Sequence, residues 1–173
     1  MTAQSIAAIH TIVIHCSATK AGRWIDAADI NKWHTSPPRN WSKIGYHWVI
    51  RLDGTREPGR AMAVRGAHVA GNNINTVGIC MIGGLDEDGK PTDTFTDLQY
   101  ESLFELLFTL KAQLPGLERI VGHRDYSPDL NGDGLITPDE WMKECPCWET
   151  RDRLPEWGLA QFMVAPNINL DGA

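Results

Sequence analysis

Continuous apolar runs mark three short strands along the chain. One run, I-H-T-I-V-I-H, closes at His15; another, T-V-G-I-C-M-I-G, spans 76–83; a third, Ile120–Val121, is separated from His123 by one glycine. Dense β-branched residues in short runs are typical of strands that are buried on both faces. We therefore expect a covered sheet, with the 76–83 strand at its centre.

An alternating apolar segment predicts a further strand and a hairpin. This segment, 44–55, reads I-G-Y-H-W-V-I-R-L-D-G-T. Three of its side chains are expected on one face: Tyr46, Trp48 and Ile50. The dipeptide Asp53-Gly54 that follows them is typical of a tight hairpin turn.

Two segments have the spacing of amphipathic helices. The first begins at an Asp26 cap and runs to about His34, where T-S-P-P-R-N ends it. The second begins with a capping box, Thr96 and Gln99, and ends before Pro115. Its apolar positions at helical spacing are Leu98, Leu103, Leu107 and Leu110. Because strands flank this second helix, we expect a β-α-β crossover that joins a parallel pair of strands.

These elements together predict a single α/β domain with a central mixed β-sheet flanked by helices. A chain of 173 residues is long enough to bury roughly two thirds of its unfolded surface. We place the domain at 8–157 and a C-terminal tail at 158–173. The end of the tail, V-A-P-N-I-N-L-D-G-A, is weakly patterned, and we expect it to be loosely ordered.

Charge and cysteine content narrow the class of protein. The formal net charge of −6 gives no support to nucleic-acid binding, and no stretch approaches the roughly 20 apolar residues of a membrane span. The N-terminus lacks the pattern of a secretory signal, so we expect a soluble chain that starts in the cytoplasm. We also expect a monomer. Four cysteines in such a chain favour free thiols or metal ligands over a disulfide framework.

The segment from His123 to Cys147 carries metal-binding chemistry. It begins with a histidine at the end of an apolar strand and ends with a lysine followed by Cys145 and Cys147. Imidazole and thiolate together suit zinc, and His15 is the best third ligand because it also closes a strand. In open α/β sheets, ligands gather beyond the carboxyl ends of the strands. The spacing alone leaves the choice between the two sulfurs open.

An acidic loop lies between the two ends of that segment. The sequence D-L-N-G-D-G-L-I-T-P-D-E, 129–140, matches the calcium-loop pattern, with Gly134 at its sharp bend. The residues predicted to bind Ca²⁺ are Asp129, Asn131, Asp133, Leu135 and Glu140. A solvated acidic turn is the alternative interpretation, and Pro128 interrupts any helix that would enter the loop.

Five separated motifs carry a resemblance to a known family. They are I-V-I-H-C-S-A-T, I-G-Y-H-W-V-I, G-A-H-V-A-G-N-N-I-N-T-V-G-I, V-G-H-R-D and K-E-C-P, in this order over about residues 8–150. The set resembles the zinc-dependent N-acetylmuramoyl-L-alanine amidases of phage endolysins and bacterial wall turnover, which are related to peptidoglycan recognition proteins. The resemblance implies an amidase / peptidoglycan-recognition-like fold, peptidoglycan as substrate, and cleavage between N-acetylmuramic acid and L-alanine.

The resemblance also implies roles for individual residues. The family's zinc ligands correspond to His15, His123 and Cys145, and its catalytic pair corresponds to Tyr46 and Lys143. The substrate contacts that it implies are His68, Asn75 and Thr76. As an endolysin the protein would be made in the host cytoplasm and act on the cell wall after release.

Three further residues are interpreted as structural, and two other functions remain as alternatives for the protein. Cys16 should point to the strand face opposite His15 as a small buried residue, and His34 and His47 are interpreted as structural. A non-catalytic peptidoglycan-binding module would keep the groove but lose a zinc ligand. A calcium-responsive interaction protein would explain 129–140 but neither histidine ligand.

Overall fold

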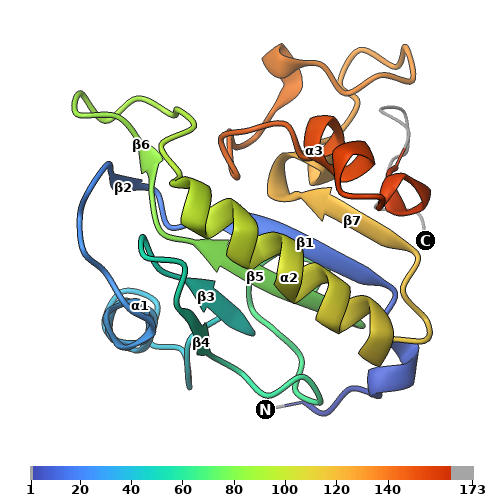
Figure 1. Cartoon of the computed structure of the whole chain (residues 1–173). Helices are drawn as coiled ribbons and strands as arrows, with labels where there is room; N and C mark the ends of the chain where they lie inside the picture. The colour runs from blue at the N-terminus through green and yellow to red at the C-terminus, as the bar shows by residue number, and fades with distance from the viewer. Residues whose placement is uncertain (1, 165–173) are drawn as a thin grey trace.

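A five-stranded mixed sheet forms the centre of the molecule (Figure 1). The structure is a computed structural model that describes residues 2–164. The strands of the sheet are β1 (Thr11–Cys16), β3 (Trp48–Ile50), β4 (Arg56–Pro58), β5 (Thr76–Met81) and β7 (Arg119–Gly122). Their order is β4-β3-β5-β1-β7, in which β4 alone is antiparallel to its neighbour. The predicted mixed sheet, with 76–83 supplying its central strand, is confirmed.

Shorter elements surround this sheet. A separate two-stranded pair is formed by β2 (Thr19–Lys20) and β6 (Gly84–Leu85). The α-helices are α1 (Ala27–Thr35), α2 (Asp97–Gln113) and α3 (Thr150–Glu156). The 3-10 helices are η1 (Ile6–Ala8), η2 (His123–Tyr126), η3 (Pro138–Glu140) and η4 (Ala160–Phe162). The predicted caps Asp26 and Thr96 both form capping boxes, which accounts for where α1 and α2 begin.

Helix α2 covers one face of the sheet (Figure 1). Every second side chain of β1, Ile12 and Ile14, points toward this face and is almost fully buried. The helix contributes Leu103, Leu107 and Leu110 to the same cluster. Leu159, which follows α3, is also fully buried there. Of the predicted tail, 158–164 is described and contains a short 3-10 helix, whereas 165–173 lies outside the described residues.

The opposite face of the sheet is covered by α1 and carries the polar residues of interest. Ile30 of α1 packs against Val49 of β3 and Cys80 of β5. The alternation of β1 places His15 on this face, because Ile12 and Ile14 occupy the other. Helices therefore cover both faces of the sheet, and His15 lies on the face that α1 covers.

Three sequence-based expectations were wrong in detail. Tyr46 does not share a face with Trp48 and Ile50, because regular pairing of β3 begins only at Trp48, and Tyr46 packs on the α1 side. Leu98 lies in the first turn of α2 and is 54% exposed, so it does not belong to the buried face of this helix. The two strands that flank α2, β5 and β7, are not paired with each other, because β1 lies between them and is parallel to both.

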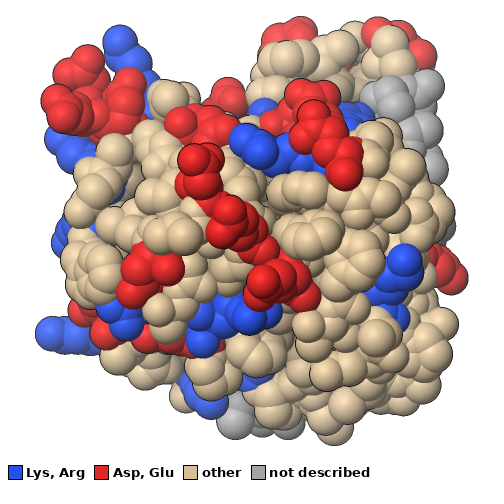
Figure 2. Space-filling view, viewed as in Figure 1, with Lys and Arg blue, Asp and Glu red and all other residues tan. Residues whose placement is uncertain are grey.

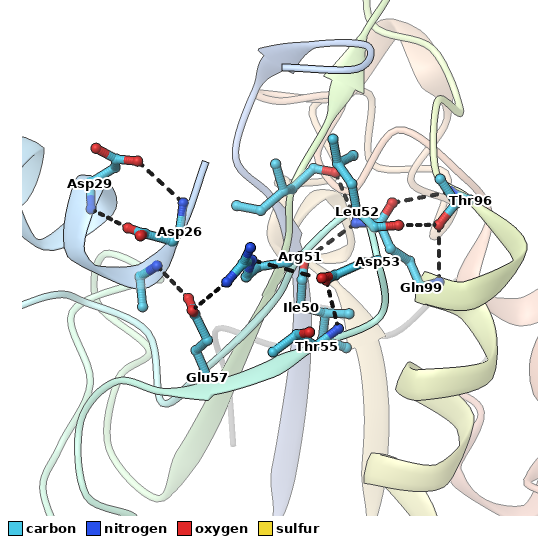
Figure 3. A network of polar contacts seen from close by, with 12 residues as sticks. Asp26, Asp29, Ile50, Arg51, Leu52, Asp53, Thr55, Glu57, Thr96 and Gln99 are labelled. Atoms are coloured by element: carbon cyan, nitrogen blue, oxygen red, sulfur yellow. Dashed lines mark hydrogen bonds and ion pairs between the residues drawn. The ribbon is translucent and has the colours of Figure 1, made fainter. Parts of the chain in front are cut away.

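Polar contacts fix the two covering helices to the hairpin β3–β4 (Figure 3). At the start of α2, the Gln99 side chain donates to the carbonyl oxygens of Ile50 (3.2 Å) and Ile82 (2.9 Å). The Thr96 hydroxyl donates to the Leu52 carbonyl at 2.7 Å. At the start of α1, Glu57 of β4 accepts a hydrogen bond from the Ala27 amide at 2.6 Å. Buried Gln99 thereby satisfies carbonyls at the ends of two strands, which would otherwise cost free energy.

The outer surface of α2 is acidic. Figure 2 shows acidic side chains that follow this helix across the viewed face. The exposed acids of α2 are Asp97, Glu101 and Glu105, of which Glu105 pairs with Arg56 at 3.1 Å. Among residues 2–164, no helix combines the length and the apolar character that a membrane crossing requires.

Candidate metal centre and groove

Two parallel strands bring His15 and His123 together. His15 is the penultimate residue of β1, and His123 directly follows the neighbouring strand β7. Their Nδ1 atoms are 3.1 Å apart, and the Sγ atom of Cys145 lies 3.8 Å from Nδ1 of His15. All three ligand atoms lie within 4.8 Å of one another. Among the described residues, this is the group of histidine, cysteine and acidic side chains arranged to hold a metal.

Backbone hydrogen bonds place Cys145 beside the histidines. The amide of Arg124 donates to the Cys145 carbonyl at 2.8 Å, which ties the cysteine to η2. The amide of Cys16 donates to Cys145 Sγ at 3.2 Å. A backbone donor aimed at the sulfur favours its thiolate form. The structure thus places Cys145, and not Cys147, in the group with both histidines.

Burial keeps the histidines of this group neutral. It lowers the pKa of His15 well below its ordinary value, and the nearby cations and imidazoles act in the same direction. Burial also lowers the pKa of His123 to about 4, with the Lys143 ammonium as the next cause. Neutral imidazole is the form that binds a metal, so these ligands are ready at neutral pH.

Three thiols meet beside the histidines. Hydrogen bonds with Cys145 and then Cys147 lower the pKa of the Cys16 thiol to about 3, while the pKa of Cys145 is raised well above its ordinary value. Cys16 is thus the common hydrogen-bond partner of the other two sulfurs. A coordinated cation would deprotonate Cys145, because a thiol bound to a metal is deprotonated outright.

A chain of hydrogen bonds starts at Nε2 of His15, the ring nitrogen that does not face His123 and Cys145. His15 Nε2 lies 3.0 Å from His68 Nδ1, and His68 Nε2 lies 3.3 Å from the Thr76 hydroxyl oxygen. That hydroxyl donates to the Asn72 carbonyl, also at 3.3 Å. A hydroxyl has a single proton, so Thr76 accepts from His68 Nε2–H, and His68 Nδ1 then accepts from His15 Nε2–H. The network therefore assigns an unprotonated Nδ1 to His15, facing His123 and Cys145.

The position of His68 depends on a glycine in the central strand. A Cβ added to Gly78 of β5 would lie 2.6 Å from Cγ of His68. The ring can therefore lie against the sheet only because Gly78 has no side chain. Asn73 fixes the backbone of the same loop, since its Oδ1 accepts from the amides of His68 (2.7 Å) and Val69 (3.0 Å).

Tyr46 and Lys143 flank the histidine–cysteine group. The Tyr46 ring centroid is 5.1 Å from that of His15, and burial raises the pKa of Tyr46 well above its ordinary value. Its phenol is therefore a neutral donor. Lys143 is exposed at the rim, and within residues 2–164 its ammonium has no carboxylate partner. Its charge is consequently free to act on a molecule in the pocket.

A pocket and an adjoining groove lie over this group. The pocket has a volume of about 260 Å³ and the groove about 610 Å³. The residues that line both are Arg39, Trp41, Ala67, His68, His123 and Lys143. Sequence reasoning missed Arg39 and Trp41, which follow a helix end and carry no motif signal. From the sequence, the proline-containing turn T-S-P-P-R-N predicted only where the preceding helix ends.

His34 also lines the pocket, and its ring packs against that of Tyr46. The two ring centroids are 5.6 Å apart, and His34 Nδ1 accepts a hydrogen bond from the Gly45 amide at 3.0 Å. Burial lowers the pKa of His34 to about 4, so this acceptor stays neutral. His47 has a similar role, because its Nδ1 accepts from the Gly78 amide at 3.0 Å.

The remaining predicted substrate residues lie elsewhere. Thr76 is 2% exposed and reaches the site only through His68. Asn75 precedes β5, at the end of the sheet away from the carboxyl end of β1, and lines a different hollow with His10 and Arg119. The structure does not bring Asn75 to the groove.

The acidic loop closes on itself by hydrogen bonds. Asp129 accepts from the amides of Gly132 (2.7 Å) and Gly134 (2.8 Å), and Asp133 accepts from the Leu135 amide (2.8 Å). Asn131 accepts from the Asp133 amide, and Glu140 accepts from three amides of the loop. The carboxylates of Asp129 and Glu140 thus order the segment between His123 and Lys143.

Comparisons with known proteins agree with this architecture. The family model of N-acetylmuramoyl-L-alanine amidase matches residues 5–147. An uncharacterized protein of Haemophilus influenzae is 51% identical over 98 residues, covering 57% of this chain and 84% of that protein. The endolysin of Klebsiella phage KP32 is 42% identical, covering 68% of this chain and 76% of its own length.

Further relatives extend the match. The endolysin of Escherichia phage T7 is 39% identical, with the same coverage of 68% and 76%. The solved structure of the endolysin amidase LysCS from Clostridium intestinale superposes with a TM-score of 0.68 at 24% identity, covering 92% of this chain and 90% of that one. The chain belongs to the N-acetylmuramoyl-L-alanine amidase family.

Proposed function

We propose that this protein is a zinc-dependent peptidoglycan amidase that hydrolyses the bond between N-acetylmuramic acid and L-alanine. The observation that carries the proposal is the meeting of His15, His123 and Cys145 within 4.8 Å at the base of the groove. The named endolysins among its relatives support a phage lysin, made in the host cytoplasm and acting on the wall after release. We take 8–157 as the catalytic domain of a monomer.

The donor set fits zinc. Two neutral imidazole nitrogens and one thiolate are ligands that zinc prefers, and three protein ligands leave a fourth position open. His123 and Cys145 would hold the metal beside the pocket that His68, Tyr46 and Lys143 also line. Zinc in such a site acts as a Lewis acid toward an amide carbonyl and makes water nucleophilic at neutral pH.

The protein's own side chains supply orientation and charge. The His68–Thr76 chain holds the proton of His15 on Nε2 and leaves Nδ1 free. In this proposal, the neutral phenol of Tyr46, which lines the pocket, donates a hydrogen bond to the oxygen that becomes negative when the amide is attacked. The exposed Lys143 ammonium, which also lines the pocket, would stabilise the same charge. Both act on the transition state and neither is a metal ligand.

Calcium binding by Asp129–Glu140 remains a prediction. Amides of the loop donate hydrogen bonds to the same carboxylate oxygens that calcium would need. The arrangement supports an ordered loop, and a titration with calcium decides whether it also binds the ion.

The test combines metal analysis with product analysis. Purified protein should contain close to one zinc per chain, and digestion of peptidoglycan should release new L-alanine amino termini. New reducing sugar ends would contradict the amidase assignment. Bound peptidoglycan without new termini would favour the non-catalytic binding module.

A further inference from the structure

Two cysteines outside the zinc ligand set face each other beside the site. Cys16 ends β1, and its Sγ lies 3.6 Å from Sγ of Cys147. Cys16 is 5% exposed, whereas Cys147 is partly exposed. Cys16 was expected to be an inert apolar residue, and its contact with a second thiol shows that it is not isolated. Neither sulfur has a role in the proposed hydrolysis.

The local backbone is shaped to hold this pair. Cys147 has φ of +73°, a left-handed conformation that is uncommon for a residue with a side chain. A turn fixes it there, since the Cys147 amide donates to the Glu144 carbonyl at 2.7 Å. On the other side, a Cβ added to Gly84 would lie 2.9 Å from Cys16 Sγ and 3.3 Å from Cys147 Sγ. The sulfurs therefore meet in space that a glycine leaves open.

We infer that Cys16 and Cys147 are a disulfide-forming pair that is oxidised by exchange with low-molecular-weight disulfides. The sulfurs need to approach by about 1.5 Å to reach bonding distance, which rotation of the two side chains can supply. Cys145 remains available to the metal, because the cross-link uses only the two sulfurs beside it. The inference concerns thiol chemistry and stands whether or not the proposed hydrolysis is correct.

The exchange proceeds in two balanced steps. Cys147 is the more exposed of the two, and it loses its proton to solvent as its sulfur attacks one sulfur of the small disulfide, forming a mixed disulfide and releasing one small thiolate. The Cys16 thiolate then attacks Cys147 Sγ, forms the internal bond and releases the second small thiolate. The protein loses two electrons and two protons, which reduce the small disulfide to two thiols.

Such a bond would join the two segments that supply zinc ligands. It would connect the end of β1, next to His15, with the turn that follows Cys145, across 131 residues of chain. Closing so long a loop restricts the unfolded chain and stabilises the folded state. Oxidising compartments outside the cytoplasm are where disulfides form and persist. The protein would then become more robust where it meets the cell wall.

The experiment maps the thiols of the full-length, zinc-loaded protein after incubation with oxidised glutathione. Free thiols are alkylated in denaturant, and the unreduced digest is analysed by mass spectrometry. We expect free thiols to fall from four to two, with Cys16 linked to Cys147 and with Cys80 and Cys145 alkylated. Four alkylated thiols, or a link that includes Cys145, would overturn the inference.

Two further measurements keep the test independent of any one variant. Oxidation should raise the melting temperature of the wild type by about 5 °C or more and leave that of Cys147→Ser unchanged. In Cys16→Ala the mixed disulfide should accumulate on Cys147, since the second thiol is missing. An equal thermal shift in Cys147→Ser, or glutathione on Cys80 in place of Cys147, would contradict the assignment.

Discussion

The imidazole of His68 lies between His15 and Thr76, 3.0 Å from Nε2 of the first and 3.3 Å from the hydroxyl oxygen of the second. His15 donates to His68, His68 donates to Thr76, and the Thr76 hydroxyl donates to the Asn72 carbonyl. A residue two steps from the metal group therefore determines which nitrogen of His15 is free. Partners of this kind typically change metal affinity or activity by about 10- to 100-fold when removed.

Thr76→Val should lower zinc affinity by roughly tenfold, because His68 Nε2–H loses its acceptor and His15 is no longer held in one tautomer. Thr76→Ser keeps the hydroxyl and is the matched control. Zinc affinity is measured by competition with a chelator, and nitrogen chemical shifts of the histidine rings report the tautomer. Equal affinity and equal shifts in both variants would reduce the hydrogen-bond chain to a packing contact.

Cys145→Ser should lose zinc, whereas Cys147→Ser should retain it. A serine hydroxyl is a far poorer zinc ligand than a thiolate at neutral pH, and only Cys145 Sγ lies beside both histidines. Metal content of the two purified variants checks the prediction. Zinc loss confined to Cys147→Ser would show that the ligand is the other sulfur.

Tyr46→Phe and Lys143→Ala should each reduce turnover by roughly 10- to 1000-fold while zinc content stays close to that of the wild type. The reason is that both side chains line the pocket without belonging to the histidine–cysteine group. Turnover is measured at saturating peptidoglycan in zinc-loaded protein. Wild-type turnover in either variant would assign that residue a structural role only.

Calcium should raise the melting temperature of zinc-loaded protein. A ligand that binds only the folded state adds roughly 2.7 kcal/mol at a hundred times its dissociation constant. Asp133→Asn is the sharpest control, because it removes a charge but keeps an acceptor for the Leu135 amide. The wild type should respond more strongly than this variant. No thermal shift and no calorimetric signal at millimolar calcium would identify the loop as an acidic turn.

Stability should fall on acidification between about pH 6.5 and pH 4. Burial lowers the pKa of His47 to about 4, whereas the unfolded residue titrates near 6.5. In this window the unfolded chain binds a proton that the folded chain does not, so stability is complete above the window and is lost as pH falls. His47 contributes roughly 3 kcal/mol to this loss.

The measurement compares melting temperatures of the wild type and His47→Gln across this range at saturating zinc. Only the difference between the two proteins is assigned to His47, because zinc release from His15 and His123 has its own pH dependence. The variant should show the shallower decline. Parallel curves would place the acid sensitivity in other groups.

The sequence was sufficient to predict that His15 and His123 meet, because strand ends can be read locally, whereas Cys145 was distinguished from Cys147 only by resemblance. His15 and His123 each close an apolar run, and parallel strands place their carboxyl ends at one edge. Tyr46 was assigned to the right pocket by resemblance but to the wrong face by alternation. Alternation holds only inside a regular strand, and β3 begins two residues later, at Trp48.

Contacts between residues that are far apart in the sequence could not be predicted from local sequence patterns. His68 was recognised as a candidate, but its contact with His15 depends on Gly78 in another strand, which reads as an ordinary apolar run. The pairing of Cys16 with Cys147 likewise depends on a turn at one end of the chain meeting a strand near the other. Arg39 and Trp41 reach the groove only because the turn after α1 folds over it.

Because the three candidate ligands are far apart along the chain, their group can assemble only late in folding. His15 and His123 are 108 residues apart, and His15 and Cys145 are 130 apart. The group forms only after β1, β5 and β7 are assembled and the turn at Cys145 has docked on η2. During synthesis, a ribosome-bound chain that has not yet reached Cys145 has no complete site, so hydrolytic capacity emerges only after nearly the whole fold has been made.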